Sequence, residues 1–317
     1  MLGPLILAAL LMYLLHPAVG SLRRRGLGIG ASILVAYLLA LSAAGVLVLA
    51  VAPVAARQGQ EFFADIPRYV RHADELVSAT RGAYLRAPLP SPVRRGIDRE
   101  VGALGDFVTG AVTDAASGLV HVAPGLAAYA LAPVVSYYAL RDLFEMPDLW
   151  SGIFEPAHAV TMRRIAGRVD AVLGGYLRGQ AIAAAMVAAL VFAAMTALEL
   201  PYAVLVAILA GVTDVVPYVG PFIGALPALV IAAGVSPAHV LLMALAIIAI
   251  HELEGSVLAP RILGRSAQLR PLSVILALMF GEGLAGFWGL VVAVPAAAVG
   301  RVLVRELFRW AVRPRSL

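Results

Sequence analysis

The sequence predicts an all-α, polytopic integral membrane protein with broken or re-entrant helices and a small helical extramembrane insertion. Of its 317 residues, 62% are apolar and only 14% are charged, whereas soluble domains carry roughly 45–50% apolar and about 25% charged residues. Several apolar runs approach or exceed the roughly 20 residues that a helix needs to cross a bilayer. Pro and Gly interrupt two of these runs, which predicts breaks in the helices.

Two apolar runs, Leu2–Val19 and Ile29–Ala56, predict the first transmembrane helices and define a first region, 1–56. The first run lacks a charged start and a small-residue cleavage site, so we interpret it as a membrane span and not as a signal peptide. In the second region, 57–117, charged residues recur and apolar residues follow a helical spacing. We expect one or two small helical hairpins there, outside the membrane.

The third region, 118–317, is predicted to be the transmembrane transport core. Its segment 155–180 is amphipathic and rich in Arg, which predicts a helix at the cytoplasmic interface. The remaining spans are expected in its apolar runs: Leu119–Leu140, Ile182–Leu198, Tyr202–Val219, Phe222–Val235, Ala238–Ile250 and Leu272–Val304.

The distribution of Arg predicts the orientation. All 24 basic residues are Arg, and short loops rich in basic residues stay in the cytoplasm. If the Arg triplet at 23–25 is cytoplasmic, alternating spans place 16 Arg on the cytoplasmic side and the other 8 in 57–117, where 8 acidic residues balance them. We therefore expect a multi-pass protein of the bacterial inner membrane, with 57–117 extracytoplasmic and the C-terminus cytoplasmic.

Several function classes lose support at this stage. The Arg residues lie between apolar runs and are not clustered on the surface of a soluble domain, so nucleic acid is not an expected partner. No Cys is present, and the motifs of nucleotide-binding loops, serine hydrolases and zinc proteases are missing. We expect neither an enzyme nor a cofactor. His251 and Glu254 share a helical face, but the sequence shows no third ligand beside them, so no metal site is expected.

The clearest functional signal is the interrupted apolar stretch 211–227. Pro217, Gly220 and Pro221 predict a broken helix or a re-entrant hairpin, which is tolerated at membrane depth only inside protein or beside a wet cavity. Asp214 lies next to the break, and a carboxylate within a span is costly and a candidate for function. The alternative is that Asp214 lies at the cytoplasmic interface, solvated or capping a short helix. Tyr218 would add a hydroxyl group.

The last apolar block has a similar pattern. Glu282, Gly283 and Gly286 interrupt it, and 292–296 resembles 225–228 in sequence. Two interrupted apolar segments in corresponding places are typical of transporter sites built from repeats. Glu282 is therefore a secondary candidate, as are His251 and Glu252.

The ordered motifs resemble the autoinducer-2 exporter (AI-2E) family of bacterial membrane proteins. The resemblance rests on Val216–Pro221, on Glu254-Gly255 followed by Leu258–Gly264, on Asp170–Gln180, on His16-Pro17 with the Arg triplet, and on Gly289–Pro295. It implies an α-helical transporter that exports a furanosyl signalling molecule or exchanges cations for protons, and a homo-oligomer, specifically a pentamer.

This chain departs from the family pattern in several places. Asp214 and His251-Glu252 stand where the family commonly has Asn and a pair of Gln, and Ser256 replaces a usual Asn. The family also usually begins with one more hydrophobic segment. The added ionisable groups favour proton or cation coupling.

The leading hypothesis is a gradient-driven transporter of a small polar solute, similar to autoinducer-2, or of an ion, in contact with the lipid bilayer. One alternative is a cation/proton antiporter of the Na⁺/H⁺ type, and another is a non-transporting assembly module that binds a partner through 57–117. An Arg261–Glu254 pair would be either part of the pathway or a static clamp between helices. The proposed pathway residues are Asp214, Pro217, Tyr218, Gly220, Pro221, Glu254 and Arg261.

Overall fold

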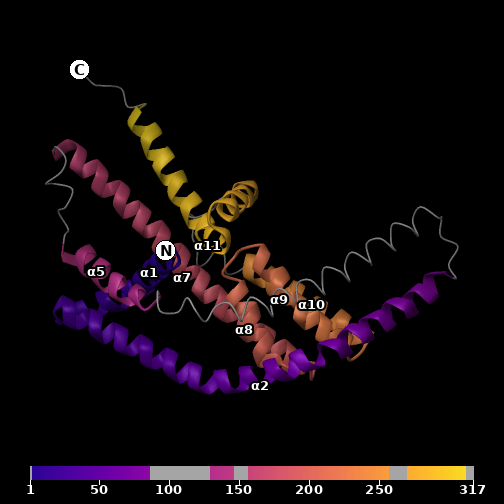
Figure 1. Ribbon diagram of the computed structural model, residues 1–317. Helices are drawn as coiled ribbons and strands as arrows, with labels where there is room; N and C mark the ends of the chain where they lie inside the picture. Colours follow the sequence, from indigo (N-terminus) through magenta and orange to yellow (C-terminus); the bar gives the residue numbers. More distant parts are fainter. Residues whose placement is uncertain (1, 86–128, 146–155, 257–269, 312–317) are drawn as a thin grey trace. The chain divides into compact units, whose positions relative to one another are not determined.

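The computed structural model describes residues 2–85, 129–145, 156–256 and 270–311, which form helices and no strand (Figure 1). Five stretches in these ranges are long and apolar enough to cross a membrane, so the predicted all-α membrane class is confirmed. The helices are α1 (Leu2–Arg24), α2 (Ile29–Leu85), α5 (Leu131–Glu145), α7 (Pro156–Ala197), α8 (Ala203–Thr213), α9 (Val219–Ala233), α10 (Pro237–Leu253) and α11 (Pro271–Ala311).

The chain divides into two compact units, which are described separately. The terminal unit comprises Met1–Val46, Ala127–Ala183 and Gly255–Leu317. The central unit comprises Leu47–Leu126 and Ala184–Glu254. Helices α2 and α7 each contribute residues to both units.

In the terminal unit, α1 packs against α5 around a small apolar core. The core residues are Leu15, Val19, Ile33, Ala36 and Leu140. Helix α1 ends where Gly26 adopts a φ of 92°, a conformation that glycine reaches without a steric penalty. Two hydrogen bonds close this end, because the N–H of Gly26 donates to the carbonyl of Arg23 and the N–H of Leu27 to that of Leu22. This Schellman arrangement satisfies carbonyls at the helix end.

The terminal unit also contains a buried carboxylate near the end of α11. Glu306 is only 3% exposed, and it forms ion pairs with Arg168 and, at 3.6 Å, with Arg164 of α7. A buried carboxylate needs such partners because its desolvation is costly. The pairs therefore tie the polar part of α7 to α11. Sequence analysis did not single out Glu306.

In the central unit, α8 packs against α9 and α9 against α10, as Figure 1 also shows. Their shared core contains Val187, Val191, Met195, Val206, Ala210, Ala228, Ile231, Ala232, Met243 and Ile250. Helix α10 begins at Pro237, directly after Ser236, whose hydroxyl accepts a hydrogen bond from the backbone N–H of His239. Ser at the cap with Pro at the first helical position is a strong helix start.

The described parts of two predicted polar segments, 57–117 and 155–180, are joined to apolar segments within single helices. Helix α2 runs on without interruption to Leu85, so the helical character expected for 57–117 is seen as far as that residue, and 86–117 lies outside the described residues. Segment 155–180 and the apolar run after it form the single 42-residue helix α7, from residue 156 onwards. The interfacial position of 155–180 stays a prediction.

Candidate functional site

The predicted break in 211–227 is confirmed. Helix α8 ends at Thr213 and α9 begins at Val219. Between them Tyr218 has a φ of 65° and a ψ of −38°, a conformation that costs a bulky residue of the order of 1–3 kcal/mol and that clusters at functional sites. The chain thus reverses direction within a few residues, through a strained turn.

Glycines let the two short helices approach each other closely. A Cβ atom at Gly220 would collide with the carbonyl oxygen of Thr213, and one at Gly224 would lie 2.7 Å from the Cα of Ala210. Since the obstacles are backbone atoms, a side chain at either position would force α8 and α9 apart. Gly220, predicted from sequence, is therefore needed for the tight turn; Gly224 and Ala210 were not predicted.

Thr213 links the two sides of the break. Its hydroxyl lies 2.8 Å from the carbonyl oxygen of Leu209 and 3.1 Å from that of Gly220, and it can donate its proton to either. Sequence analysis missed Thr213, although its position next to Asp214 at a helix end was a usable signal. A hydroxyl here helps to satisfy the backbone polar groups that the break releases.

Asp214 is the buried carboxyl group of the site. Its side chain is only 2% exposed, and its backbone N–H caps α8 by donating to the carbonyl of Ala210 at 2.9 Å. One of its carboxylate oxygens lies within 4.8 Å of a ring nitrogen of His251 and of a carboxylate oxygen of Glu254, both from the end of α10. The structure therefore supplies the third group that the sequence did not show beside His251 and Glu254.

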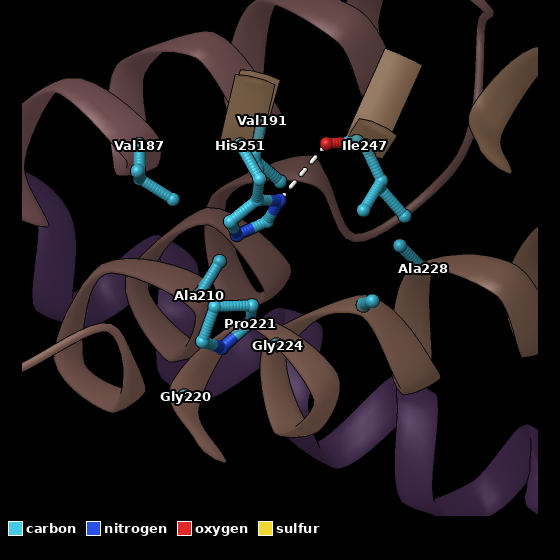
Figure 2. Close-up of a pocket in the computed structure, with 10 residues that line it drawn as sticks. Val187, Val191, Ala210, Gly220, Pro221, Gly224, Ala228, Ile247 and His251 are labelled. Atoms are coloured by element: carbon cyan, nitrogen blue, oxygen red, sulfur yellow. Dashed lines mark hydrogen bonds between the residues drawn. The ribbon is translucent and has the colours of Figure 1, made fainter. Parts of the chain in front are cut away.

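The hydrogen bond of His251 defines which ring nitrogen is available. Its Nδ1 lies 2.9 Å from the carbonyl oxygen of Ile247 (Figure 2). Because a carbonyl only accepts, Nδ1 carries the proton, and in the neutral ring Nε2 carries a lone pair. Nε2 is buried and makes no hydrogen bond within the described part of the chain. Metal-binding histidines commonly have one ring nitrogen held by a backbone carbonyl in this way.

A small cavity adjoins His251. Figure 2 shows the imidazole pointing from α10 toward Ala210 and Pro221 across this space. The cavity measures about 10 Å³ and is lined by His251, Gly220, Pro221, Gly224 and apolar side chains. That is roughly the space that one water molecule needs.

The remaining predicted residues have different positions. Pro217 and Pro221 lie at the break and are half-buried, whereas Tyr218 is exposed. Glu252 is exposed on α10, and Glu282 is exposed on α11, in the terminal unit. Arg261, and with it the Arg261–Glu254 pair, lies outside the described residues.

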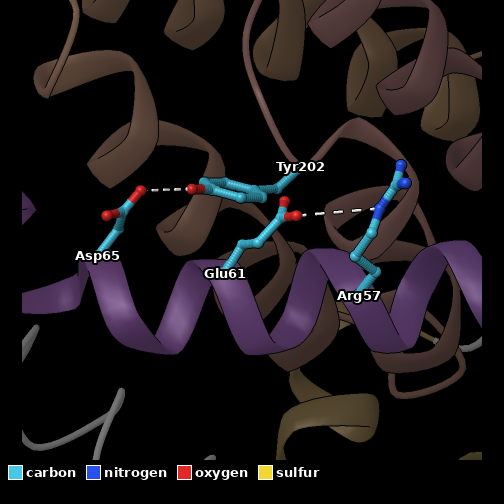
Figure 3. A network of polar contacts seen from close by, with 4 residues as sticks. All are labelled: Arg57, Glu61, Asp65 and Tyr202. Atoms are coloured by element: carbon cyan, nitrogen blue, oxygen red, sulfur yellow. Dashed lines mark hydrogen bonds and ion pairs between the residues drawn. The ribbon is translucent and has the colours of Figure 1, made fainter.

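Helix α2 fixes the other end of α8. The hydroxyl of Tyr202 donates to a carboxylate oxygen of Asp65 at 2.6 Å, and the N–H of Leu205 donates to the side-chain oxygen of Gln58 at 3.0 Å. The latter bond satisfies one of the free N–H groups at the start of α8. Figure 3 shows Tyr202 over α2, beside the exposed Arg57–Glu61 pair.

Comparison with known proteins gives a consistent result over almost the whole chain. Residues 1–309 match the model of the AI-2E family transporters. The protein YrrI of Bacillus subtilis (strain 168), described as a candidate transport protein, is 30% identical over 306 residues, covering 96% of this chain and 86% of YrrI. YueF of the same organism, with the same description, is 25% identical over 310 residues, covering 96% of this chain and 84% of YueF.

Proposed function

This chain belongs to the AI-2E transporter family, and from that premise we propose that it moves an ion or a small polar solute across the membrane through the α8–α9 break, driven by an ion gradient. The observation that carries the proposal is Asp214, a carboxylate buried at a break between two apolar helices. The family resemblance inferred from the sequence is confirmed by the match over residues 1–309.

The lengths of the two helices support a position of the break at membrane depth. Helix α8 has 11 residues and α9 has 15, which correspond to roughly 16 and 22 Å. Neither reaches across a hydrocarbon core of roughly 30 Å, although both are almost wholly apolar. A pair of this kind enters and leaves the bilayer on one side, and the backbone of its turn then has to face protein or a wet cavity.

The polar groups at the turn support coupling to an ion. Asp214 faces His251 and Glu254, two further ionisable groups on α10. A carboxylate in low-dielectric surroundings is stable when it holds either a proton or a cation. Alternation between these two partners is the requirement for exchange of protons against a solute or ion.

The size of the cavity beside His251 favours an ion over a sugar-sized solute in this conformation. Its volume of about 10 Å³ holds roughly one water molecule. A furanosyl compound would need the turn to open. The Na⁺/H⁺ type of antiport and the export of a signalling molecule are distinguished by the measured cargo.

We propose that the protein lies in the cell membrane, with 57–117 outside the cell and the C-terminus in the cytoplasm. We also propose that it assembles as a homo-oligomer. The chain has no Cys, so a single Ser91→Cys variant reports topology directly. Labelling of intact cells by a membrane-impermeant maleimide supports this orientation, and labelling only after the cytoplasm is opened contradicts it. Native mass spectrometry of the purified protein gives the number of protomers.

The test of transport is flux in liposomes that contain only this protein. With a pH gradient imposed, the proposal expects accumulation of a test cation, or a change in lumenal pH when the cation is added, and much slower flux without the gradient. Protein-free liposomes are the control for leakage. Cation and solute fluxes equal to those of protein-free liposomes would contradict the proposal and favour a non-transporting assembly module.

A further inference from the structure

We propose that Asp214, His251 and Glu254 form a binding site for a divalent transition-metal cation, of the kind represented by Zn²⁺ or Co²⁺. The three side chains come from the α8–α9 turn and from the end of α10, and their ligand atoms lie within 4.8 Å of one another. The proposal that these residues bind a metal rests on geometry alone. The further proposal that the metal is the transported cargo also rests on the proposed function.

The spacing suits one ion. Two ligands that each lie roughly 2.1 Å from a tetrahedral metal are roughly 3.4 Å apart. The observed limit of 4.8 Å exceeds this by roughly 1.4 Å, which rotations of the carboxylate side chains can close. Three protein ligands leave at least one position for water or for an exchanging ligand, as in sites that are not purely structural.

The ligand types distinguish between cations. Oxygen ligands alone suit Na⁺, Mg²⁺ and Ca²⁺, whereas imidazole suits Zn²⁺, Co²⁺, Ni²⁺ and Fe²⁺. The ring of His251 is held by the Ile247 carbonyl at 2.9 Å, which leaves Nε2 as the nitrogen with a lone pair, buried and without a hydrogen bond in the described residues. A backbone carbonyl behind the ring is the usual arrangement for a metal-binding His.

The charges indicate a divalent ion. Two carboxylates and a neutral imidazole carry two negative charges, and Asp214 is only 2% exposed. Burying uncompensated charge is strongly unfavourable. A divalent cation balances both negative charges of these three ligands, whereas a monovalent cation balances one of them.

Two of the three ligands, His251 and Glu254, lie within the candidate membrane span Pro237–Ser256. His251 follows Pro237 by 14 positions, or roughly 21 Å along the helix, and the candidate membrane span continues to Ser256. A metal site within a membrane-spanning helix would adjoin the proposed route across the membrane. This position is the reason to consider the bound metal as cargo.

The test measures Zn²⁺ and Co²⁺ binding to the full chain, purified in detergent without a polyhistidine tag. We expect about one Zn²⁺ per protomer by titration calorimetry, and a visible Co²⁺ spectrum. Each of Asp214→Asn, His251→Gln and Glu254→Gln should weaken the affinity at least about ten-fold. His239→Gln is the matched control, because His239 lies on the same helix but bonds to Ser236; Glu61→Gln, at an exposed site, is the control for carboxylates.

Several outcomes would overturn the inference: no binding by the unaltered chain, equal affinity in His251→Gln and His239→Gln, or an affinity for Ca²⁺ or Na⁺ equal to that for Zn²⁺. Circular dichroism shows whether each variant is folded. If His251→Gln fails to fold, Asp214→Asn, which keeps the shape of the side chain, decides the question. Zn²⁺ binding without flux in liposomes overturns the proposed transport and leaves the site; flux unchanged in the absence of metal binding overturns the site and leaves transport.

Discussion

The break between α8 and α9 and the kink inside α11 use similar residues but place different side chains at the turn. Gly220 approaches the backbone of Thr213 at the first, and Gly281 approaches that of Gly289 at the second. The first turn buries Asp214 near two further ligand groups. The second turn, at Ala285 and Gly286, borders a cavity of about 420 Å³ lined by apolar and aromatic residues. Pro and Gly thus make a helix break, and the polar groups buried at the break make a candidate site.

The largest expected difference in stability comes from replacing a glycine by alanine at each break. In Gly220→Ala the new Cβ collides with the Thr213 carbonyl, so the free energy of unfolding should fall by about 3 kcal/mol, with loss of flux. In Gly283→Ala no atom lies within 4 Å of the new Cβ, and stability should rise by about 0.5–1 kcal/mol because alanine favours helix. Denaturant titration followed by circular dichroism measures both; equal effects would show that the two glycines are equally confined by their surroundings.

A second difference concerns the residues with positive φ. Gly286 has a φ of 56° and a ψ of −135°, so Gly286→Ala should cost about 1–3 kcal/mol of stability. Tyr218 adopts a positive φ although it is not glycine, so Tyr218→Gly should raise stability by up to about 1 kcal/mol while flux falls. A less stable Tyr218→Gly protein in the same titration would show that the contacts of the tyrosine outweigh the strain in its backbone.

The smallest expected difference is between a half-buried hydroxyl group that contacts a backbone carbonyl, Thr213, and an exposed carboxylate, Glu282. Thr213→Val removes the hydroxyl near the Gly220 carbonyl and should lower the free energy of unfolding by about 1–2 kcal/mol. Glu282 is exposed, and Glu282→Gln should change it by less than about 0.5 kcal/mol. If Glu282→Gln is more destabilising than Thr213→Val, the side chain of Glu282 makes a stabilising polar contact at the α11 kink.

The apolar runs were sufficient to predict the helices and both breaks, because Pro and Gly act locally. The sequence did not predict the joining of 155–180 to the next run, since an amphipathic segment and an apolar one share the same helical period. It also did not bring Asp214 to His251 and Glu254. Helical spacing places His251 and Glu254 on one face, but which helix packs against that face is decided by tertiary contacts of glycine and alanine, whose small side chains leave little pattern.

Some of the residues predicted from the sequence lie together at the α8–α9 break, and others do not. Asp214 and Glu254 were predicted and come together with His251, which had been secondary. Glu252, the neighbour of His251, is exposed. A one-residue step on a helix turns the side chain by about 100°, and the sequence alone does not define which of two adjacent residues faces the site.

The most direct test compares flux in liposomes for Asp214→Asn and Glu282→Gln, each with and without an imposed pH gradient. Asn keeps the shape of the side chain but holds no charge, so a folded Asp214→Asn protein should carry a flux that no longer depends on the gradient. Glu282→Gln, at the exposed position of the other break, should behave like the unaltered chain. Gradient dependence that persists in Asp214→Asn, or that disappears in Glu282→Gln, would contradict the assignment of transport to the α8–α9 break.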